Sequence, residues 1–250
     1  MSADPIAIRV VPNGDAALVA EFGETVDPEV NARVLALADR IAEARIGGVV
    51  ETQPTFRSLL VCFDPARISY RALAPRVAAL AAGPRRRIRE GRLWRLPICY
   101  DRSVAPDLDE AAERLRLSPD ALIARHSEIV HRVYMLGFLP GQPYLGDLPA
   151  ELALPRRASP RVGVAAGSVG IAQRMTCLFP RETPCGLNLI GRTPAPLWDA
   201  RRHEAALLEP GDRVIFSPVP LDLFERLTES VRQGETICAP EGGMTQEAAA

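Results

Sequence analysis

Lysine is absent from this chain of 250 residues, so all 30 of its basic residues are arginines. The chain therefore has no lysine for a Schiff base, for nucleophilic attack or for a phosphate-binding P-loop. A coding sequence rich in G and C would give the same bias, but the consequence for chemistry is unchanged. If the protein handles a nucleotide, arginines and backbone amides, or a partner, must bind the phosphates.

Other absences narrow the class of protein further. The five cysteines are widely spaced and include no C-x-x-C pair, which favours free thiols in a reducing compartment. No apolar run reaches about 18 residues, and the first residues lack the regions of a signal peptide. The net charge of -1 argues against nucleic acid or an anionic membrane as a partner. We therefore predict a cytoplasmic protein, and one without a protein-ligated metal because no cluster has metal-ligand spacing.

Residues 1–90 carry the pattern of a small α/β sandwich. Asn13-Gly14 favours a tight hairpin turn, and Asp27-Pro28-Glu29 supplies a helix cap, a first-turn proline and an early acid. Gly47-Gly48 is expected to end that helix. The expected elements are two strands within 6–22, a helix from residue 28, strands at 49–53 and 57–63, and a helix over 69–82.

The arginine-rich stretch PRRRIREGR, residues 84–92, separates this region from the rest. It has two interpretations, a phosphate-binding patch or a solvated linker between domains. We favour the linker, because no aromatic residues interleave with the arginines to stack on bases. The predicted domains are therefore residues 1–90 and 91–240.

Residues 91–240 are predicted to form a compact β-barrel, which makes the fold class α+β. Between 129 and 219 the chain reads as short strands broken by prolines and glycines. Gly211-Asp212 is interpreted as the entry to a final hairpin, and the tail 241–250 is expected to be disordered because it has no packing signal. The other expected elements are a strand at 93–100 and helices at 107–116, 119–127 and 221–232.

A series of motifs in fixed order carries a family resemblance. These are GDAALVAEFG, VVETQPTFRSLLVCFDP and LPICY in the first half, then HS, VYMLGFLPGQPYLG, two Pro-Arg pairs, AGSVGIA and LIGRT. Together they resemble the B-subunit family of bacterial 5-oxoprolinase, also known as allophanate hydrolase subunit 1 and as the KipI family. The resemblance covers roughly residues 8–220 and implies a cyclophilin-like barrel for the second domain.

The resemblance also implies a function that needs other chains. The expected partners are a C-type barrel protein (allophanate hydrolase subunit 2) and an A-type protein of the LamB/YcsF kind. The complex would convert 5-oxoproline, ATP and water into glutamate, ADP and phosphate, with any magnesium held at the complex and this chain inactive alone. Two alternatives stay open: a KipI-like histidine-kinase inhibitor, and the carboxyltransferase half of a urea carboxylase or allophanate hydrolase-like system.

Opening a lactam places charge on oxygen, so guanidinium and amide N–H groups are the parts that such a site needs. Arg161 and Arg192 are the catalytic candidates, although a buried arginine often only ties loops to carbonyl groups. The remaining substrate-binding candidates follow the family motifs: Tyr134, Tyr144, Gly167, Ser168, Val169, Gly170 and Thr193.

Three further residue types have competing interpretations. His126 is the third catalytic candidate, as a general base or a group that orients a carbonyl, but at a helix end it would equally stabilise the dipole. His131 and His203 match no motif and are expected at the surface. Ser168 nearly completes G-x-S-x-G, but residues 169–172 read as a strand, which favours a turn or oxyanion contact over a nucleophile. Cys185 is interpreted as a small apolar filler.

This chain departs from the family pattern in four places, all predicted to be loops. Gln142 replaces an aromatic residue, Cys177 falls in a stretch that is usually glycine-rich, and Cys185 and Leu187 replace a glycine and a tryptophan. The segment 101–108 replaces another glycine-containing loop. The departures leave the fold assignment intact, but they indicate a reshaped pocket and allow a different small amide or cyclic substrate.

Overall fold

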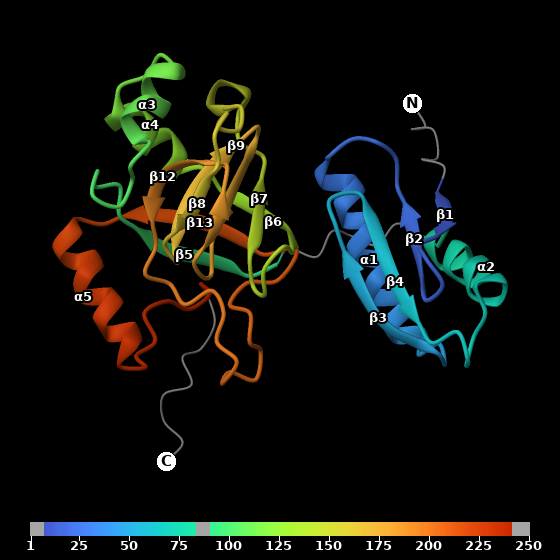
Figure 1. Ribbon diagram of the computed structural model, residues 1–250. Coiled ribbons are helices and arrows are strands. Elements are labelled where there is room, and N and C mark those ends of the chain that lie inside the picture. The colour runs from blue at the N-terminus through green and yellow to red at the C-terminus, as the bar shows by residue number, and fades with distance from the viewer. Residues whose placement is uncertain (1–7, 84–90, 242–250) are drawn as a thin grey trace. The chain divides into compact units, whose positions relative to one another are not determined.

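The structure of the protein is a computed structural model, in which residues 8–83 and 91–241 are described. The chain forms two compact units, residues 1–90 and 91–250 (Figure 1). The arginines of the predicted linker at 84–90 and the tail at 242–250 lie outside the described residues.

Two residues that were expected in the linker and the tail belong to the second unit. The Arg92 guanidinium pairs with Asp212, with 2.9 Å between Nη2 and Oδ2. The Glu241 backbone N–H donates to the carbonyl of Leu93 at 2.7 Å. The second unit therefore includes the last residue of the arginine-rich stretch, and it extends one residue beyond its predicted end at 240.

The first unit is a four-stranded antiparallel sheet with two helices, in the predicted ββαββα order. The sheet order is β1-β2-β4-β3, and α1 and α2 pack against the sheet strands and against each other (Figure 1). The core between the sheet and the helices is apolar, with Leu18, Leu37, Leu59 and Val77 fully buried. The elements are β1 (Arg9–Pro12), β2 (Ala17–Glu21), α1 (Pro28–Ala44), β3 (Val49–Pro54), β4 (Ser58–Phe63) and α2 (Tyr70–Ala81).

The start of α1 is as predicted and its end is not. Asp27 Oδ1 accepts hydrogen bonds from the backbone N–H groups of Glu29 and Val30, so it is the predicted cap. The helix ends at Ala44, because Arg45 adopts a left-handed conformation with φ 44°. The expected stop at Gly47-Gly48 is therefore wrong by about one turn.

The second unit is built on a seven-stranded sheet in the order β12-β9-β10-β7-β6-β13-β5. Its edges meet where Cys99 and Arg192 exchange two backbone hydrogen bonds of 2.8 Å, so the sheet is nearly closed into a barrel. The strands are β5 (Leu93–Ile98), β6 (His131–Leu136), β7 (Pro143–Gly146), β9 (Ser168–Ala172), β10 (Met175–Leu178), β12 (Asn188–Arg192) and β13 (Arg213–Pro218).

The hairpin predicted after Gly211-Asp212 is wrong. Strand β13 does not pair with a strand adjacent to it in sequence; it lies between β6 and β5 and runs parallel to β5. Residues 214–216 therefore lie inside the sheet, with Val214 and Phe216 buried and Ile215 partly buried.

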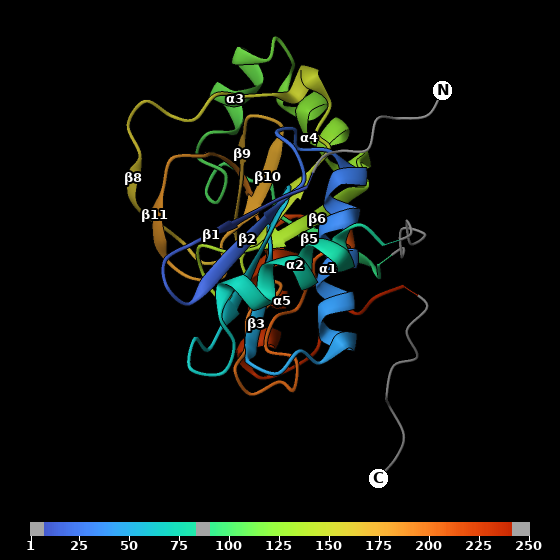
Figure 2. The ribbon, with the colours of Figure 1, turned by 90° about the vertical axis from the view of Figure 1, so that its right-hand side faces the viewer.

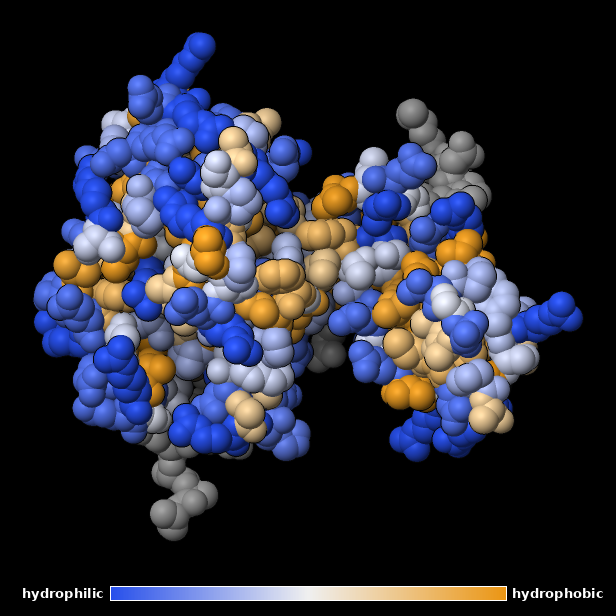
Figure 3. Space-filling model, in the orientation of Figure 1, coloured by the Kyte–Doolittle hydropathy of each residue, from blue (hydrophilic) through white to orange (hydrophobic). Residues whose placement is uncertain are grey.

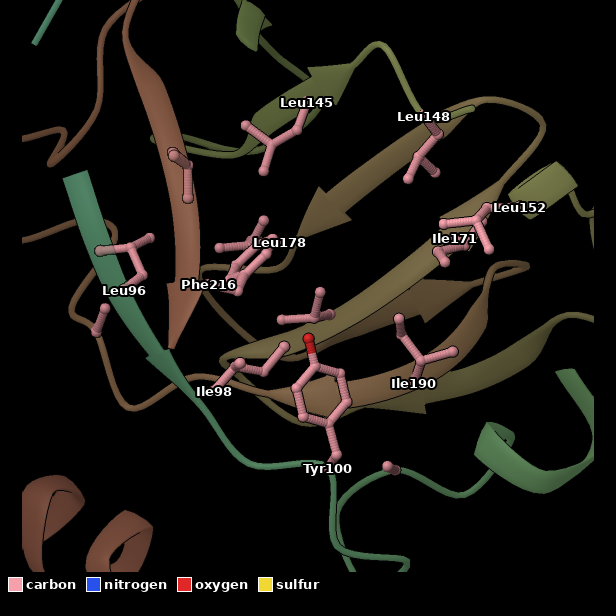
Figure 4. Close-up of a cluster of buried hydrophobic side chains, with 14 of the residues drawn as sticks. Leu96, Ile98, Tyr100, Leu145, Leu148, Leu152, Ile171, Leu178, Ile190 and Phe216 are labelled. Carbon is pink, nitrogen blue, oxygen red and sulfur yellow. The ribbon is translucent and has the colours of Figure 1, made fainter. Parts of the chain in front are cut away.

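Alternation along the strands gives the sheet two distinct apolar faces. Leu145, Ile171, Leu178 and Ile190 point into the barrel, where Phe216 joins them (Figure 4). The residues between them face outward and are covered by a two-stranded ribbon, β8 (Arg161–Val164) and β11 (Thr183–Cys185), which lie side by side in Figure 2.

Three helices complete the second unit at positions that the sequence predicts: α3 (Leu108–Arg114), α4 (Pro119–Glu128) and α5 (Leu221–Arg232). A 3-10 turn at Ala150–Leu152 was not predicted. Figure 3 shows hydrophilic residues over the visible face of each unit, with hydrophobic patches between them. In the parts of the chain that are described, no helix has the length and apolar character needed to cross a membrane.

Candidate functional site

Four of the predicted site residues meet at the corner where β9 begins and β12 ends. Ser168 lies opposite Arg192 in the strand register, and the Thr193 N–H donates to the Gly167 carbonyl at 2.9 Å. Gly167 has φ +82°, and a Cβ added there would collide with the Thr193 carbonyl oxygen. The corner therefore requires glycine at this position, and it brings Gly167, Ser168, Arg192 and Thr193 together.

The backbone amides of this corner are engaged within the fold. The Gly167 N–H donates to the Phe179 carbonyl at 2.7 Å and the Ser168 N–H to the Ala165 carbonyl at 3.1 Å. Val169 and Gly170 lie inside β9, which pairs with strands on both sides. The predicted oxyanion contact from these amides would compete with hydrogen bonds that the barrel needs, so the Arg192 side chain is the better donor to a ligand at this corner.

Ser168 is not on a nucleophile elbow. Strand β9 leads into β10 through a tight turn, not into a helix. The predicted strand at 169–172 is confirmed, and the strand-to-helix geometry that the G-x-S-x-G motif requires is not present here.

Arg192 reaches from the corner into a groove of about 310 Å³ beside α5. Its Nε–H donates to the Ala166 carbonyl at 2.8 Å, and its guanidinium lies 5.7 Å from the ring centre of Phe224. Burial lowers the pKa of Arg192, and the positive charge of Arg232 lowers it further. The groove is lined by Ser103, Val104, Arg192, Leu221, Phe224, Glu225, Thr228 and Arg232.

Arg161 occupies a different environment, in an ion-pair network centred on a buried carboxylate. Its two Nη groups bind both oxygens of Asp107 at 2.7 and 2.6 Å, and Arg157 adds a third contact to Asp107 at 2.8 Å. The Asp107 side chain is only 3% exposed, and its Oδ2 also accepts from the Leu189 N–H at 2.7 Å. The hydrogen bond to Asp107 raises the pKa of Arg161.

This geometry favours the scaffolding interpretation for Arg161. The network joins the ribbon strand β8 to the start of α3 and to β12, three segments that are distant in sequence. When an arginine binds both oxygens of a desolvated carboxylate, its Nη groups are already engaged in strong hydrogen bonds. Arg161 therefore has little free capacity to stabilise charge on a substrate.

The outward face of the sheet holds a separate apolar cluster that contains three of the departures from the family pattern. The loop position expected for Cys177 and Cys185 is wrong: Cys177 lies in β10, opposite Tyr144 and Gly170 of the neighbouring strands, and Cys185 ends β11 of the covering ribbon. Leu187 follows shortly after that strand. A Cβ on Gly170 would lie 2.9 Å from Leu187 Cβ, so this glycine makes room for the leucine. The departures are thus one connected change in packing, although the sequence scatters them over separate segments.

The thiols of this outer cluster are suited to packing. Burial raises the pKa of Cys177 to about 12 and also raises that of Cys185, although Arg161 and Arg156 act in the opposite direction on Cys185. Burial also raises the pKa of the Tyr144 hydroxyl, which lies half-buried at the edge of the cluster. Neutral thiols at neutral pH agree with the apolar-filler interpretation of Cys185.

His126 lies inside the second unit with no exposed surface. Its Nδ1 is 2.7 Å from the Tyr100 hydroxyl, its Nε2 is 3.2 Å from the Thr176 hydroxyl, and its ring stacks on Phe216. Burial lowers its pKa well below the usual value for histidine. A substrate would have to displace these partners to reach the ring, so the structure gives His126 a packing role and leaves its catalytic role a prediction.

The surface position expected for His131 is wrong. Its ring is fully buried next to His126, with ring centres 5.0 Å apart, and its Nε2–H donates to the His126 carbonyl at 3.1 Å. Burial lowers its pKa to about 4. The strand period explains the error, because His131 shares the inward face of β6 with Val133. His203 is exposed, as predicted.

Tyr134 is also turned toward the interior of the fold. Its hydroxyl donates to Asp147 Oδ1 at 2.6 Å, and its ring occupies the space over Gly146 where a side chain would otherwise lie. Asp147 has φ +69°, so the hydrogen bond holds a residue in an uncommon conformation. Substrate contact by Tyr134 stays a prediction.

Two residues of these sites were not predicted from the sequence. Asp107 was placed only at the start of a helix, and Arg232 only at the end of one. Their partners are 54 and 40 residues away, at Arg161 and Arg192, so no local pattern could pair them.

Across residues 8–83 and 91–241, no group of three or more histidine, cysteine or acidic side chains is arranged to hold a metal ion.

Residues 8–208 match the family model "Carboxyltransferase domain, subdomain C and D". The 5-oxoprolinase B subunit of Bacillus subtilis (strain 168) is 37% identical over 81% of this chain and 89% of its own length. The crystal structure of TTHA0988 is 37% identical with a TM-score of 0.73 over 81% of this chain, which spans only 40% of that longer protein.

A more distant structure agrees in fold alone. The Kluyveromyces lactis urea carboxylase is 22% identical, with a TM-score of 0.80 over 94% of this chain and 24% of that chain. The fold is therefore shared with part of a much larger protein.

Proposed function

This chain belongs to the carboxyltransferase domain family, subdomain C and D, and on that basis we propose that it is a cytoplasmic subunit of an ATP-dependent 5-oxoprolinase. The observation that carries the proposal is the match to the 5-oxoprolinase B subunit of Bacillus subtilis over 89% of that protein. The complex would convert 5-oxoproline, ATP and water into glutamate, ADP and phosphate. The five free cysteines suit a reducing compartment.

The chemistry of the reaction explains why a guanidinium group is needed. A lactam is a resonance-stabilised amide, and transfer of the ATP γ-phosphoryl group to its oxygen makes the carbonyl carbon electrophilic. Water then adds to that carbon and the ring C–N bond breaks, which leaves an acyl phosphate. A second water attacks the acyl carbon, and the phosphate leaves with the former lactam oxygen. Negative charge collects on oxygen at each stage, where a fixed cation gives the largest stabilisation.

Arg192 is the residue of this chain that we assign to that role. Its Nε–H donates to the Ala166 carbonyl, and its guanidinium packs near the Phe224 ring. These two contacts orient the Nη groups before a ligand binds. Thr193 and Gly167 hold the corner from which it projects. The guanidinium groups of the groove fit phosphate oxygens, whereas a magnesium site would come from another chain of the complex.

The remaining catalytic groups are proposed to come from other chains. The groove provides arginines and one carboxylate, Glu225, but no general base next to Arg192. TTHA0988 contains more than twice the length matched by this chain, which supports a domain that works with additional protein. We propose a C-type barrel protein and an A-type protein as the partners, with this chain inactive alone.

The test is reconstitution from separately purified chains. We expect glutamate and ADP from 5-oxoproline and ATP only when all three proteins are mixed, and loss of at least about 100-fold in rate with Arg192→Gln, as for loss of an oxyanion donor. Absence of glutamate above the no-enzyme background in every combination would rule the proposal out. Arg226→Gln on the exposed face of α5 is the matched control and should leave the rate unchanged.

A second candidate is the carboxyltransferase half of a biotin-dependent system, favoured by the fold shared with urea carboxylase. It predicts that a biotinylated carrier copurifies with this chain and that urea or a related amide accepts a carboxyl group. A complex that consumes ATP and 5-oxoproline without biotin would decide against it.

A further inference from the structure

The groove beside α5 contains two arginines, and only one of them lies on a family motif. Arg192 belongs to the motif LIGRT, whereas Arg232 is in the last turn of α5, after residue 208, where the match to the family model ends. Five of the lining residues come from helix α5, and Ser103 and Val104 also line the groove. The groove is therefore completed by a helix that lies beyond the family match.

Arg192 shares its groove with one acid, Glu225, but forms no ion pair with a described carboxylate. Of its donors, Nε–H is bonded to a carbonyl group, and the guanidinium packs near the Phe224 ring. Within the described part of the chain, no carboxylate forms an ion pair with it, and its side chain is only partly exposed. A partly desolvated cation without a counter-charge is unfavourable for the free protein, which is the condition expected of a group that awaits an anionic ligand.

Arg232 adds a second positive charge to the lining of the groove. It is close enough that its charge acts unfavourably on that of Arg192. Its own contact to Glu229 is an exposed pair of 3.5 Å, which is weak, and Glu225 is an exposed residue of the groove lining. Two cations that repel one another across a groove are both stabilised when an oxyanion binds between them.

We propose that this groove is a binding site for a phosphate-class oxyanion, held by Arg192 from the barrel and Arg232 from α5. The groove volume of about 310 Å³ accommodates a phosphate group together with part of the molecule that carries it. The choice of phosphate over other oxyanions rests on the proposed function, in which ATP is consumed. The affinity of the groove for an oxyanion does not rest on it.

The test uses the full chain and inorganic phosphate, titrated by calorimetry at constant ionic strength. We expect saturable binding to the wild type, and binding weaker by at least about tenfold in both Arg192→Gln and Arg232→Gln. The matched control is Arg226→Gln, because Arg226 is also on α5 and also pairs with an acid one turn away but does not line the groove. This control should bind phosphate like the wild type.

Arg232 is highly exposed, so its replacement leaves the fold intact, which circular dichroism verifies. No saturable binding to the wild type, or equal weakening in Arg226→Gln, would overturn the proposal. A parallel titration with ATP identifies the source of the anion: competition with phosphate indicates a nucleotide, and phosphate binding without competition indicates free phosphate or a phosphorylated acid. If the reconstituted complex is inactive, the proposed function is wrong, but saturable phosphate binding would still support the oxyanion site.

Discussion

Arg161 and Arg192 are the same residue type on the same barrel, yet their surroundings are opposite. Arg161 meets a carboxylate with only 3% of its surface exposed, and its pKa is raised by the hydrogen bond to Asp107. Arg192 meets a carbonyl, an aromatic ring and another cation, and its pKa is lowered by burial. The charge of Arg161 is compensated by a carboxylate of the same chain, whereas the charge of Arg192 is compensated by a ligand from outside the chain.

The difference provides a criterion for sorting arginines in an uncharacterised protein. A compensated guanidinium stabilises the fold and is costly to remove, because its carboxylate is left buried and unpaired. An uncompensated one contributes little to folding and is retained for a ligand. Exposure alone would not separate the two residues, since both side chains are partly buried.

The largest expected effect is at the centre of the compensated region. Asp107→Asn removes the charge that Arg157 and Arg161 share, and we expect the free energy of unfolding to fall by roughly 3–5 kcal/mol. Urea unfolding followed by circular dichroism measures it. Asp109→Asn, at an exposed pair with Arg102, should cost much less than Asp107→Asn, because solvent screens an exposed ion pair. Equal losses in the two variants would contradict the assigned role of Asp107.

The buried histidines, and not the two arginine regions, are expected to make the protein less stable at low pH. Burial lowers the folded-state pKa of His131 to about 4 from the ordinary histidine value of about 6.5, and it lowers the pKa of His126 as well. The unfolded chain therefore binds protons more readily, so stability is fully present above about pH 6.5 and is lost as the pH falls toward about 4. The loss attributable to His131 is roughly 3 kcal/mol.

His131→Gln should reduce this acid loss, because glutamine does not titrate. Urea midpoints at a series of pH values test it, with the exposed His203→Gln as the control that should follow the wild type. An unchanged pH profile in His131→Gln would show that other groups cause the acid sensitivity.

A smaller effect is expected at the corner that supports the uncompensated arginine. Gly167→Ala forces a side chain into a left-handed conformation against the Thr193 carbonyl, and we expect a loss of roughly 1–3 kcal/mol. Gly14→Ala is the control, because Gly14 also has positive φ but has no atom within 4 Å of the added Cβ. The loss at Gly167 should exceed the loss at Gly14 by the cost of the collision, and the reverse order would contradict the corner geometry.

Local patterns predicted the elements well because their signals lie within a few residues. The cap at Asp27, the helix from Ser69 and the strand at 169–172 each depend on neighbours in sequence. The errors arise where distant segments decide the outcome. Strand β13 enters the sheet between β6 and β5, and His131 is covered by residues from α4 and β13.

The candidate site was predicted only in part for the same reason. Motif order singled out Arg192, Gly167 and Thr193, which the fold does bring together. It gave no means to distinguish Arg161 from Arg192, because the residues that do so, Asp107 and Arg232, lie at the start of α3 and in α5. The connected change at Cys177, Cys185 and Leu187 was likewise visible only after the ribbon had been placed over the sheet.

The most direct test of the contrast is urea unfolding of Arg161→Gln and Arg192→Gln, each with and without phosphate at constant ionic strength. We predict that Arg161→Gln loses roughly 2–3 kcal/mol but keeps the stabilisation that phosphate gives the wild type. Arg192→Gln should change stability by less than about 1 kcal/mol without phosphate and gain nothing from adding it. The opposite assignment, in which Arg192→Gln is the destabilised variant and Arg161→Gln loses the response to phosphate, would contradict the distinction between the two arginines.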